Sequence, residues 1–545
     1  MFDTHQVSNQ PKPLTDYNLM LSDPQLVHWV QHFNGHWGAS DIQELASTLG
    51  QPAWIERGHT ANEHIPQLFT HDAAGYRRDE VRYHPAYHAL MDLAISHNIH
   101  ALPWQTQQAG AHVVRMAKNY CHNQNEAGSA CPLTMTFACH PSLQASPAIA
   151  QHWLPGVTAS QYDPSNQPMQ DKKGLTIGMA MTEKQGGTDV RANTSRAIYD
   201  GSDDWGERYL MSGHKWFCSA PMSDAFLTLA QTEQGLSCFL MPRWTLNGDK
   251  NPIHIQRLKN KLGNRSNASS EIEFHQAQGW LLGKPDQGVR TIIQMVALTR
   301  YDCMIGSTAL MRQALSQVIN HISQRTVMGK KLIDQPLMQN VVVDMALDWV
   351  GALALTSRLA HALDQNHDPA EQAFVRLMTA VGKYWICKQA MMLTAEACEC
   401  MGGAGYIEEH INARLYREAP VNSIWEGSGN VQCLDVLRAL QKQPDSWTAV
   451  SQMLQQACGT QDIYDQQVMQ FIEHQHPAQV DTYRARSWVS ELAMFMQAGL
   501  LLQHDQPDWA EAYCIGRLSK PRFGAYGQLP KLIDTATLIN RILLK

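Results

Sequence analysis

Residues 415–430 read LYREAPVNSIWEGSGN, and a glycine turn, MGGAGY, precedes them at residues 401–406. Within this stretch Glu426 stands between a bulky indole, Trp425, and Gly427. A carboxylate in such a tight and dry setting suits general-base chemistry, because partial desolvation raises the pKa of an acid. The alternative is a glutamate that the dipole of a helix N-terminus favours. The stretch by itself leaves both interpretations open.

Two glycine-bearing loops upstream carry groups that a flavin could use. Residues 181–189 read MTEKQGGTD, and residues 213–219 read GHKWFCS. A flavin needs hydrogen-bond partners at its ring edge and flexible backbone near its pyrophosphate. Thr182, Thr188 and Ser219 offer the partners, and Gly186-Gly187 offers the flexible backbone. Either loop alone is more often a plain β-turn, so only the combination with residues 415–430 favours a flavin site.

The chain of 545 residues is too long for a single core and should divide into several units. Helical apolar spacing occurs in Met311, Leu315, Val318 and Ile322, whereas short apolar runs between turn residues indicate strands in AFLTLAQT (225–232) and GLSCFLMP (235–242). We therefore predict four segments: a mainly α-helical one at 1–178, a compact β domain at 179–285, a helical bundle at 286–443 and a further helical unit at 444–545.

Several familiar sequence motifs are absent, and their absence narrows the reactions that the protein could catalyse. The sequence has no GxGxxG after a strand, no GxxxxGK[ST], no HExxH and no HxE with PCxxC, which disfavours nicotinamide, ATP-cleaving and zinc-hydrolase functions. Twelve cysteines without a CxxC pair suit neither zinc nor a disulfide framework, so we expect no metal. With no leader-like start and no apolar run of about 20 residues, we expect a cytoplasmic protein without a membrane segment.

Taken together, these segments resemble the acyl-CoA dehydrogenase superfamily. Its MTE-x-x-x-G-[ST]-D loop, G-x-K strand, K-L-G-x-R segment, MGG-x-G-Y turn and Y-R-[DE]…I-x-E-G-[ST] ending all occur in the family's order between residues 181 and 430. The sequence is most similar to the AidB subgroup, flavoproteins of the bacterial adaptive response to DNA alkylation. That similarity rests on MTEKQGGTDV (181–190), GHKWFCSAPMSDA (213–225), RLKNKLGNRSNASSEIEF (257–274) and PVNSIWEGSGNVQCLDVLR (420–438).

The resemblance implies a mainly α fold with a central β domain, an acyl-CoA dehydrogenase-like bundle and an additional C-terminal helical domain. It also implies FAD as the cofactor and Glu426 as the base that removes the α-proton of an acyl thioester. Arg325 and the Gly402-Gly403 turn would reach the FAD of a neighbouring chain in a homotetramer. The implied cofactor contacts are Met181, Thr182, Gly187, Thr188, Trp216, Phe217, Ser219, Arg325, Gly402, Gly403, Ile424, Trp425, Gly427, Ser428, Gly429 and Asn430.

Departures from the family pattern bear on substrate choice. Trp425 stands where a smaller tyrosine is common, so it should narrow the acyl cavity unless it is simply a core residue. Phe217 and Cys218 replace the usual tryptophan and isoleucine, which puts a flavin contact by the Cys218 thiol in doubt. Two functions stay open: an AidB-type flavoprotein that protects DNA against alkylation, or a metabolic dehydrogenase of short or branched acyl-CoA that passes electrons to an electron-transfer flavoprotein.

Double-stranded DNA is the remaining partner that the resemblance implies. The net formal charge of −7 gives no overall attraction to nucleic acid, and residues 445–545 hold eight basic and ten acidic residues. Between Glu511 and Asp534, however, the chain has basic residues and no acid. Such a stretch predicts either a phosphate-binding surface or an ordinary solvated face. The DNA-contacting candidates are Arg517, Lys520, Arg522 and Lys531.

Overall fold

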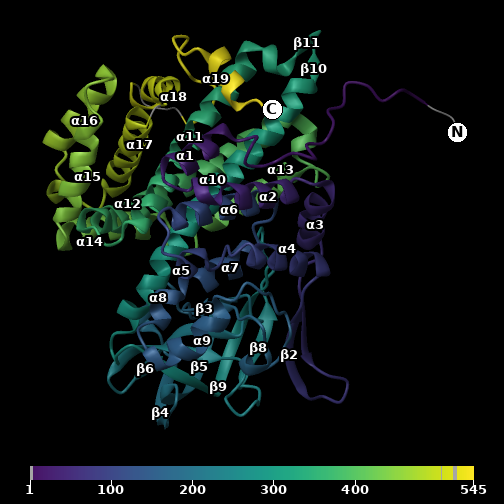
Figure 1. Cartoon of the computed structure of the whole chain (residues 1–545), viewed down its shortest axis with the longest axis vertical. Helices are drawn as coiled ribbons and strands as arrows, with labels where there is room; N and C mark the ends of the chain where they lie inside the picture. The colour runs from purple at the N-terminus through teal and green to yellow at the C-terminus, as the bar shows by residue number, and fades with distance from the viewer. Residues whose placement is uncertain (1–3, 505, 520–523, 545) are drawn as a thin grey trace. The chain divides into compact units, whose positions relative to one another are not determined.

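The computed structural model describes residues 4–504, 506–519 and 524–544 (Figure 1). The chain forms two compact units. The first, here the helical unit, comprises residues 1–52, 109–124 and 303–545; the second, the sheet unit, comprises residues 53–108 and 125–302. The packing divides the predicted N-terminal segment, residues 1–178, between both units. The segment boundaries predicted at 178, 285 and 443 stay predictions.

The sheet unit is built on one seven-stranded sheet. Its strands run in the order β3-β6-β4-β5-β9-β7, β8 pairs with β9, and β7 also pairs with β6, so the path closes on itself. The two predicted strands coincide with β6 and β7, which form an antiparallel hairpin from Ala225↔Pro242 to Thr232↔Gly235. The bounds are β3 Ile177–Ala180, β4 Arg196–Asp203, β5 Gly206–Ser219, β6 Ala225–Thr232, β7 Gly235–Pro242, β8 Ile253–Leu258 and β9 Ser269–Leu282.

Inward side chains of alternate strand positions form the core of this sheet. Met211, Phe226, Phe239, Ile272 and Phe274 are each at most 2% exposed. Strands β6 and β7 are buried on both faces, whereas on β5 buried positions alternate with more exposed ones. The predicted β domain is therefore confirmed as a fold element, and it fixes the direction of every side chain on β5.

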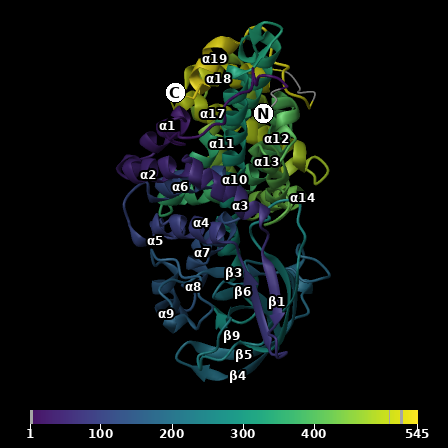
Figure 2. The same ribbon diagram turned by 90° about the vertical axis from the view of Figure 1, so that its right-hand side faces the viewer.

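A hairpin that we did not predict stands beside this sheet. Strands β1 (Gln67–His71) and β2 (Arg77–Arg82) pair antiparallel and lie next to β8 (Figure 1). Figure 2 shows β1 in front of the labelled sheet strands. Their turn is held by Asp72 Oδ1, which accepts hydrogen bonds from the backbone N–H groups of Ala74 and Tyr76, both at 2.9 Å. Strand β2 consists almost entirely of charged residues, and neither strand shows apolar alternation, so no hydrophobic signal marked them.

Helices complete the sheet unit. These are α3 (Pro52–Glu63), α4 (Pro85–Ser96), α5 (Leu102–Gln105), α7 (Ala130–Ala138), α8 (His140–Leu143) and α9 (Pro147–Val157). Five of these six helices, all except α7, begin with proline at the first or second helical position, where its missing N–H costs nothing.

The helical unit contains the long antiparallel helices that the apolar spacing predicted. Met311, Leu315, Val318 and Ile322 on α10 are all fully buried. Helix α11 is apolar and long enough to cross a membrane, but 89% of its apolar window is buried inside the protein, as expected for a core helix. The bounds are α1 Pro24–His32, α2 Ala39–Leu49, α6 Ala111–Asn125, α10 Gly288–Gln324, α11 Pro336–Asp364, α12 Pro369–Met401, α13 Ile411–Asn422 and α14 Gly429–Lys442. The first part of α10, residues 288–302, belongs to the sheet unit.

The C-terminal helices pack on one another through aromatic side chains. Trp488 of α17 contacts Phe471 of α16 and Trp447 of α15, with ring centroids 5.3 and 5.6 Å apart. Helix α17 also packs against α11 and α12. The bounds are α15 Asp445–Gln456, α16 Asp462–His474, α17 Ala485–Gln503, α18 Pro507–Tyr513 and α19 Thr535–Ile542, with a π-helical turn at Cys514–Leu518.

The structure corrects one predicted DNA contact in this region. Arg517 is 4% exposed, and its guanidinium pairs with Asp344 and Asp348 of α11, each at 2.7 Å. A side chain committed to two buried carboxylates cannot also bind phosphate at the surface. Lys531 is exposed, whereas Lys520 and Arg522 lie outside the described residues. The predicted basic surface therefore loses Arg517.

A stacked histidine cluster joins the N-terminal helix to the end of α17. His504 lies with its ring centroid 4.4 Å from that of His32, and Phe33 stacks on His361 at 4.8 Å. Burial, and then the nearby charges of His32, Arg358, His28 and His361, lower the pKa of His504 to about 4.

We predict that this cluster makes the helical unit acid-sensitive. Because the folded-state pKa of His504 lies below that of an unfolded histidine, its contribution to stability is complete above about pH 6.5 and is lost as pH falls towards 4. After allowance for partial solvent exposure, the loss should be roughly 1–2 kcal/mol. His504→Phe should show a smaller drop in Tm between pH 7.5 and pH 5 than the wild type, with the exposed His474→Phe as control. An equal drop in all three proteins would contradict the prediction.

Candidate flavin and base site

The candidate base lies in a tight loop between α13 and α14. Helix α13 ends at Asn422, just after Pro420, and Ser428 precedes α14 with extended backbone angles. Between them Glu426 and Gly427 have φ values of +58° and +98°. For glutamate this left-handed conformation costs about 1–3 kcal/mol, and such strain concentrates at functional sites. Glu426 is half-buried, and its backbone adopts a conformation that glutamate avoids unless its surroundings hold it there.

Two buried side chains bond to the backbone of this loop. The ammonium of Lys383, on α12, donates to the carbonyl oxygens of Trp425 at 2.7 Å and Gly427 at 2.6 Å. The amide nitrogen of Gln432, on α14, donates to the carbonyls of Glu426 and Gly427, both at 3.0 Å. Neither residue was among the predicted site residues.

Further contacts fix the two ends of the loop. Trp425 Nε1 donates to Asn422 Oδ1 at 3.1 Å, and the Asn422 amide donates to Ser307 Oγ at 3.2 Å. Asn430 Oδ1 accepts from Arg486 Nε of α17 at 2.8 Å, so its amide nitrogen is the group left to meet a cofactor. Ile424 is 65% exposed. Residues 424–430, all predicted as one site, do form one local structure.

The predicted neighbour contacts also lie in the helical unit. Gly402, with φ of +62°, ends α12, and a Cβ added at Gly402 or Gly403 would meet no atom within 4 Å. Arg325 Nη1 donates to the carbonyl of Asn9 at 2.5 Å, just before the hairpin β10 (Thr326–Val327) and β11 (Lys330–Lys331). Their roles toward the FAD of a second chain stay predictions.

In the sheet unit, the loop 181–189 is joined to β5 by a buried ion pair. Glu183 and Lys215, both fully buried, lie 2.9 Å apart, and Lys215 also donates to the Leu229 carbonyl. Glu183 further accepts from Thr194 N at 2.7 Å and from Gln185 Nε2 at 2.8 Å. Burial alone would raise the pKa of Glu183, but Lys215 and these hydrogen bonds lower it to about 2. The ion pair therefore stays charged and anchors the loop.

This anchor brings several predicted flavin contacts together. The carbonyl of Thr182 accepts a hydrogen bond from Trp216 N at 2.8 Å, and that of Met181 accepts one from Asn193 at 3.1 Å. A Cβ added at Gly187 would stand 2.4 Å from Thr182 Oγ1, so only glycine allows this close approach. Met181, Thr182, Gly187 and Trp216 thus form one surface, whereas Thr188 is exposed at the loop's end.

The end of β5 presents alternating side chains. Phe217 is 48% exposed, whereas Cys218 is fully buried, and burial raises the pKa of its thiol to about 12. Ser219 Oγ lies 3.1 Å from Ser269 Oγ. The Cys218 thiol is buried, and the absence of a flavin contact by this thiol stays a prediction. Exposed Phe217, the Thr182 and Ser219 hydroxyls and open glycine backbone fit a large planar cofactor with polar edges.

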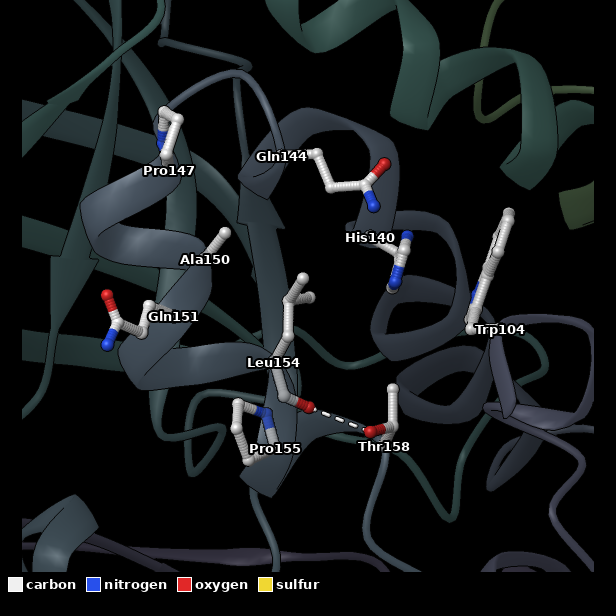
Figure 3. Close-up of a pocket in the computed structure, with 9 residues that line it drawn as sticks. All are labelled: Trp104, His140, Gln144, Pro147, Ala150, Gln151, Leu154, Pro155 and Thr158. Carbon is white, nitrogen blue, oxygen red and sulfur yellow. Dashed lines mark hydrogen bonds between the residues drawn. The ribbon is translucent and has the colours of Figure 1, made fainter. Parts of the chain in front are cut away.

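A separate pocket of about 690 Å³ lies between α5, α8 and α9 of the sheet unit (Figure 3). Trp104 stacks on His140 at 4.4 Å on one wall, and Leu154 and Pro155 form another. The pocket contains none of the predicted site residues. It therefore does not mark the candidate flavin site.

Comparison with known proteins agrees with this geometry. Residues 9–164 match the adaptive response protein AidB N-terminal domain, residues 178–277 the acyl-CoA dehydrogenase middle domain, and residues 286–441 the acyl-CoA dehydrogenase C-terminal domain. Among solved structures, Caenorhabditis elegans ACDH-11 in complex with C11-CoA superposes with a TM-score of 0.85 at 24% identity, covering 96% of each chain. The Bd2924 apo-form gives 0.83 at 24% identity, covering 91% of this chain and 99% of that one. At this identity the structures establish the fold alone.

The chain belongs to the acyl-CoA dehydrogenase family, whose members are FAD-dependent oxidoreductases that act on CH–CH bonds. Within that family it is of the AidB type. AidB of Escherichia coli (strain K12) is 45% identical to it over 518 residues, which cover 94% of either chain.

Proposed function

We propose that the protein binds FAD and dehydrogenates an acyl-CoA thioester, with Glu426 as the base. A carboxylate oxygen of Glu426 would take the α-proton, and the β-hydride would leave the substrate, so that a carbon–carbon double bond forms. Bound FAD supplies the acceptor for that hydride. The observation that carries the proposal is the strained loop at Glu426, fixed by Lys383 and Gln432.

The residues on the sheet unit would bind and orient the cofactor. The Thr182 and Ser219 hydroxyls offer hydrogen bonds, and Phe217 offers an exposed ring face for contact. Trp425 would narrow the acyl cavity, which favours short or branched acyl chains over long ones. The solved ACDH-11 structure contains C11-CoA, so a CoA thioester has precedent within this fold. An electron-transfer flavoprotein as acceptor and a cytoplasmic location stay predictions.

We expect anaerobic addition of a suitable acyl-CoA to bleach the flavin absorbance of the purified yellow protein. A panel should compare straight-chain and branched acyl-CoAs of increasing length, with free CoA as the control. Short or branched thioesters should reduce the flavin fastest if Trp425 limits the cavity. A flavin that no member of the panel reduces would exclude the dehydrogenase function.

We also propose a DNA-associated role, which rests on membership of the AidB subgroup. Because Arg517 is buried in ion pairs, the test should leave it unchanged and replace Lys520, Arg522 and Lys531 by Ala. We expect weak, sequence-independent binding of double-stranded DNA whose log K falls with log salt by roughly 0.9 per phosphate contact. The triple variant should bind more weakly with a shallower slope. Unchanged binding would reject this surface and favour the metabolic alternative.

A further inference from the structure

Lys383 is a buried cation whose hydrogen bonds go to backbone carbonyls. Lys383 lies on α12 and is 1% exposed. In the part of the chain that the structure describes, no carboxylate forms an ion pair with it. Lysine is almost never fully buried unless its charge is compensated. Here the compensation comes from two backbone carbonyls, those of Trp425 and Gly427, on either side of Glu426.

Gln432 completes the arrangement from the other side. It is fully buried, and its amide nitrogen bonds to the carbonyls of Glu426 and Gly427. Three consecutive carbonyls therefore point at two side chains from different helices. A Cβ added at Gly427 would lie 2.7 Å from Gln432 Nε2, so glycine is what lets the amide approach. Together these hydrogen bonds hold the backbone of Glu426 in its left-handed conformation.

We propose that Lys383, assisted by Gln432, is a positioning residue that holds the Glu426 backbone in its left-handed conformation and so aims the carboxylate. This inference rests on the proposed function of Glu426. Lys383 acts through the backbone of the loop and need not touch substrate or cofactor. Release of its two hydrogen bonds would allow the loop to relax towards ordinary backbone angles, which turns the carboxylate away from the position for proton removal.

A purely packing role for Lys383 makes different predictions. Lys383→Met keeps the long stem but removes the donors, whereas Lys383→Arg keeps a charge with several donors. Lys388, half-buried five residues further along α12, provides the matched control Lys388→Met. If only the stem mattered, Met would behave as the wild type and Arg would be worse.

The test uses the FAD-loaded full-length protein and two separate measurements. Hydrogen exchange followed by mass spectrometry should show faster exchange in a peptide covering 423–430 for Lys383→Met, with the rest of α12 and the FAD content unchanged. Anaerobic flavin reduction by the best acyl-CoA should be roughly 10²-fold slower, with a larger isotope effect from α-deuterated substrate and little change in substrate affinity. Lys383→Arg should recover part of both effects, and Lys388→Met should show neither.

The possible outcomes distinguish the positioning role of Lys383 from the proposed function of Glu426. Unchanged exchange in 423–430 for Lys383→Met would overturn the positioning role, whatever the activity. Faster exchange with undiminished flavin reduction would show that Lys383 holds the loop but does not aim the carboxylate, which overturns the positioning role and leaves the proposed function to the Glu426→Gln test. A wild-type protein that no acyl-CoA reduces would reject the proposed function, and the exchange measurement would still decide the role of Lys383 in the loop.

Discussion

Glu426→Gln is expected to abolish reduction of the bound flavin by acyl-CoA while leaving FAD in place. The amide keeps the size and shape of the side chain but cannot accept the α-proton. Loss of a general base typically lowers the rate by about 10²–10⁴-fold. Anaerobic stopped-flow absorbance gives the reduction rate, and the ratio of flavin to protein absorbance gives the FAD content.

The matched control for this substitution is Glu409→Gln, an exposed glutamate before α13 in the same unit. It should leave the rate unchanged. Near-wild-type reduction in Glu426→Gln would move the base to another group. Loss of FAD from that variant would instead show that Glu426 is needed to build the site, because a residue with a purely chemical role should not affect cofactor binding.

The sequence predicted elements whose signal is local. The apolar runs 225–232 and 235–242 correspond to strands β6 and β7. A continuous apolar stretch between turn residues is typical of a strand that is buried on both faces. The sequence motif around Glu426 predicted where the site loop lies, but it did not predict the positive φ angle of Glu426. The hairpin β1–β2 was missed because its strands are mostly polar.

Residues whose role depends on distant partners could not be found in this way. Lys383 lies about forty positions before the loop it bonds to, and a helical lysine by itself indicates only a solvated charge. Arg517 was assigned to DNA because its own segment lacks acidic residues. Its partners, Asp344 and Asp348, come from a helix far upstream, and a local charge count cannot detect them.

Arg517 is therefore expected to be essential for stability. Asp344 and Asp348 lie four residues apart on one face of α11, with side chains 3% and 1% exposed. Tyr526 donates to Asp348 at 2.9 Å, and the backbone N–H of Gly527 donates to Asp344 at 3.0 Å. The guanidinium thus bonds to two buried carboxylates at the point where the C-terminal segment meets the bundle.

Arg517→Met should lower the free energy of unfolding by about 3–5 kcal/mol, because it removes the cation that bonds to two buried carboxylates while largely preserving volume. Denaturant unfolding measures the loss, and limited proteolysis should show earlier cleavage of the C-terminal helices. The triple variant Arg517→Met, Asp344→Asn, Asp348→Asn removes all three charges and should recover much of the stability, since the cost of losing Arg517 lies in the buried carboxylate charge rather than in lost packing. An Arg517→Met protein that unfolds like the wild type but binds DNA less tightly would contradict this structural role and return Arg517 to the phosphate-binding surface.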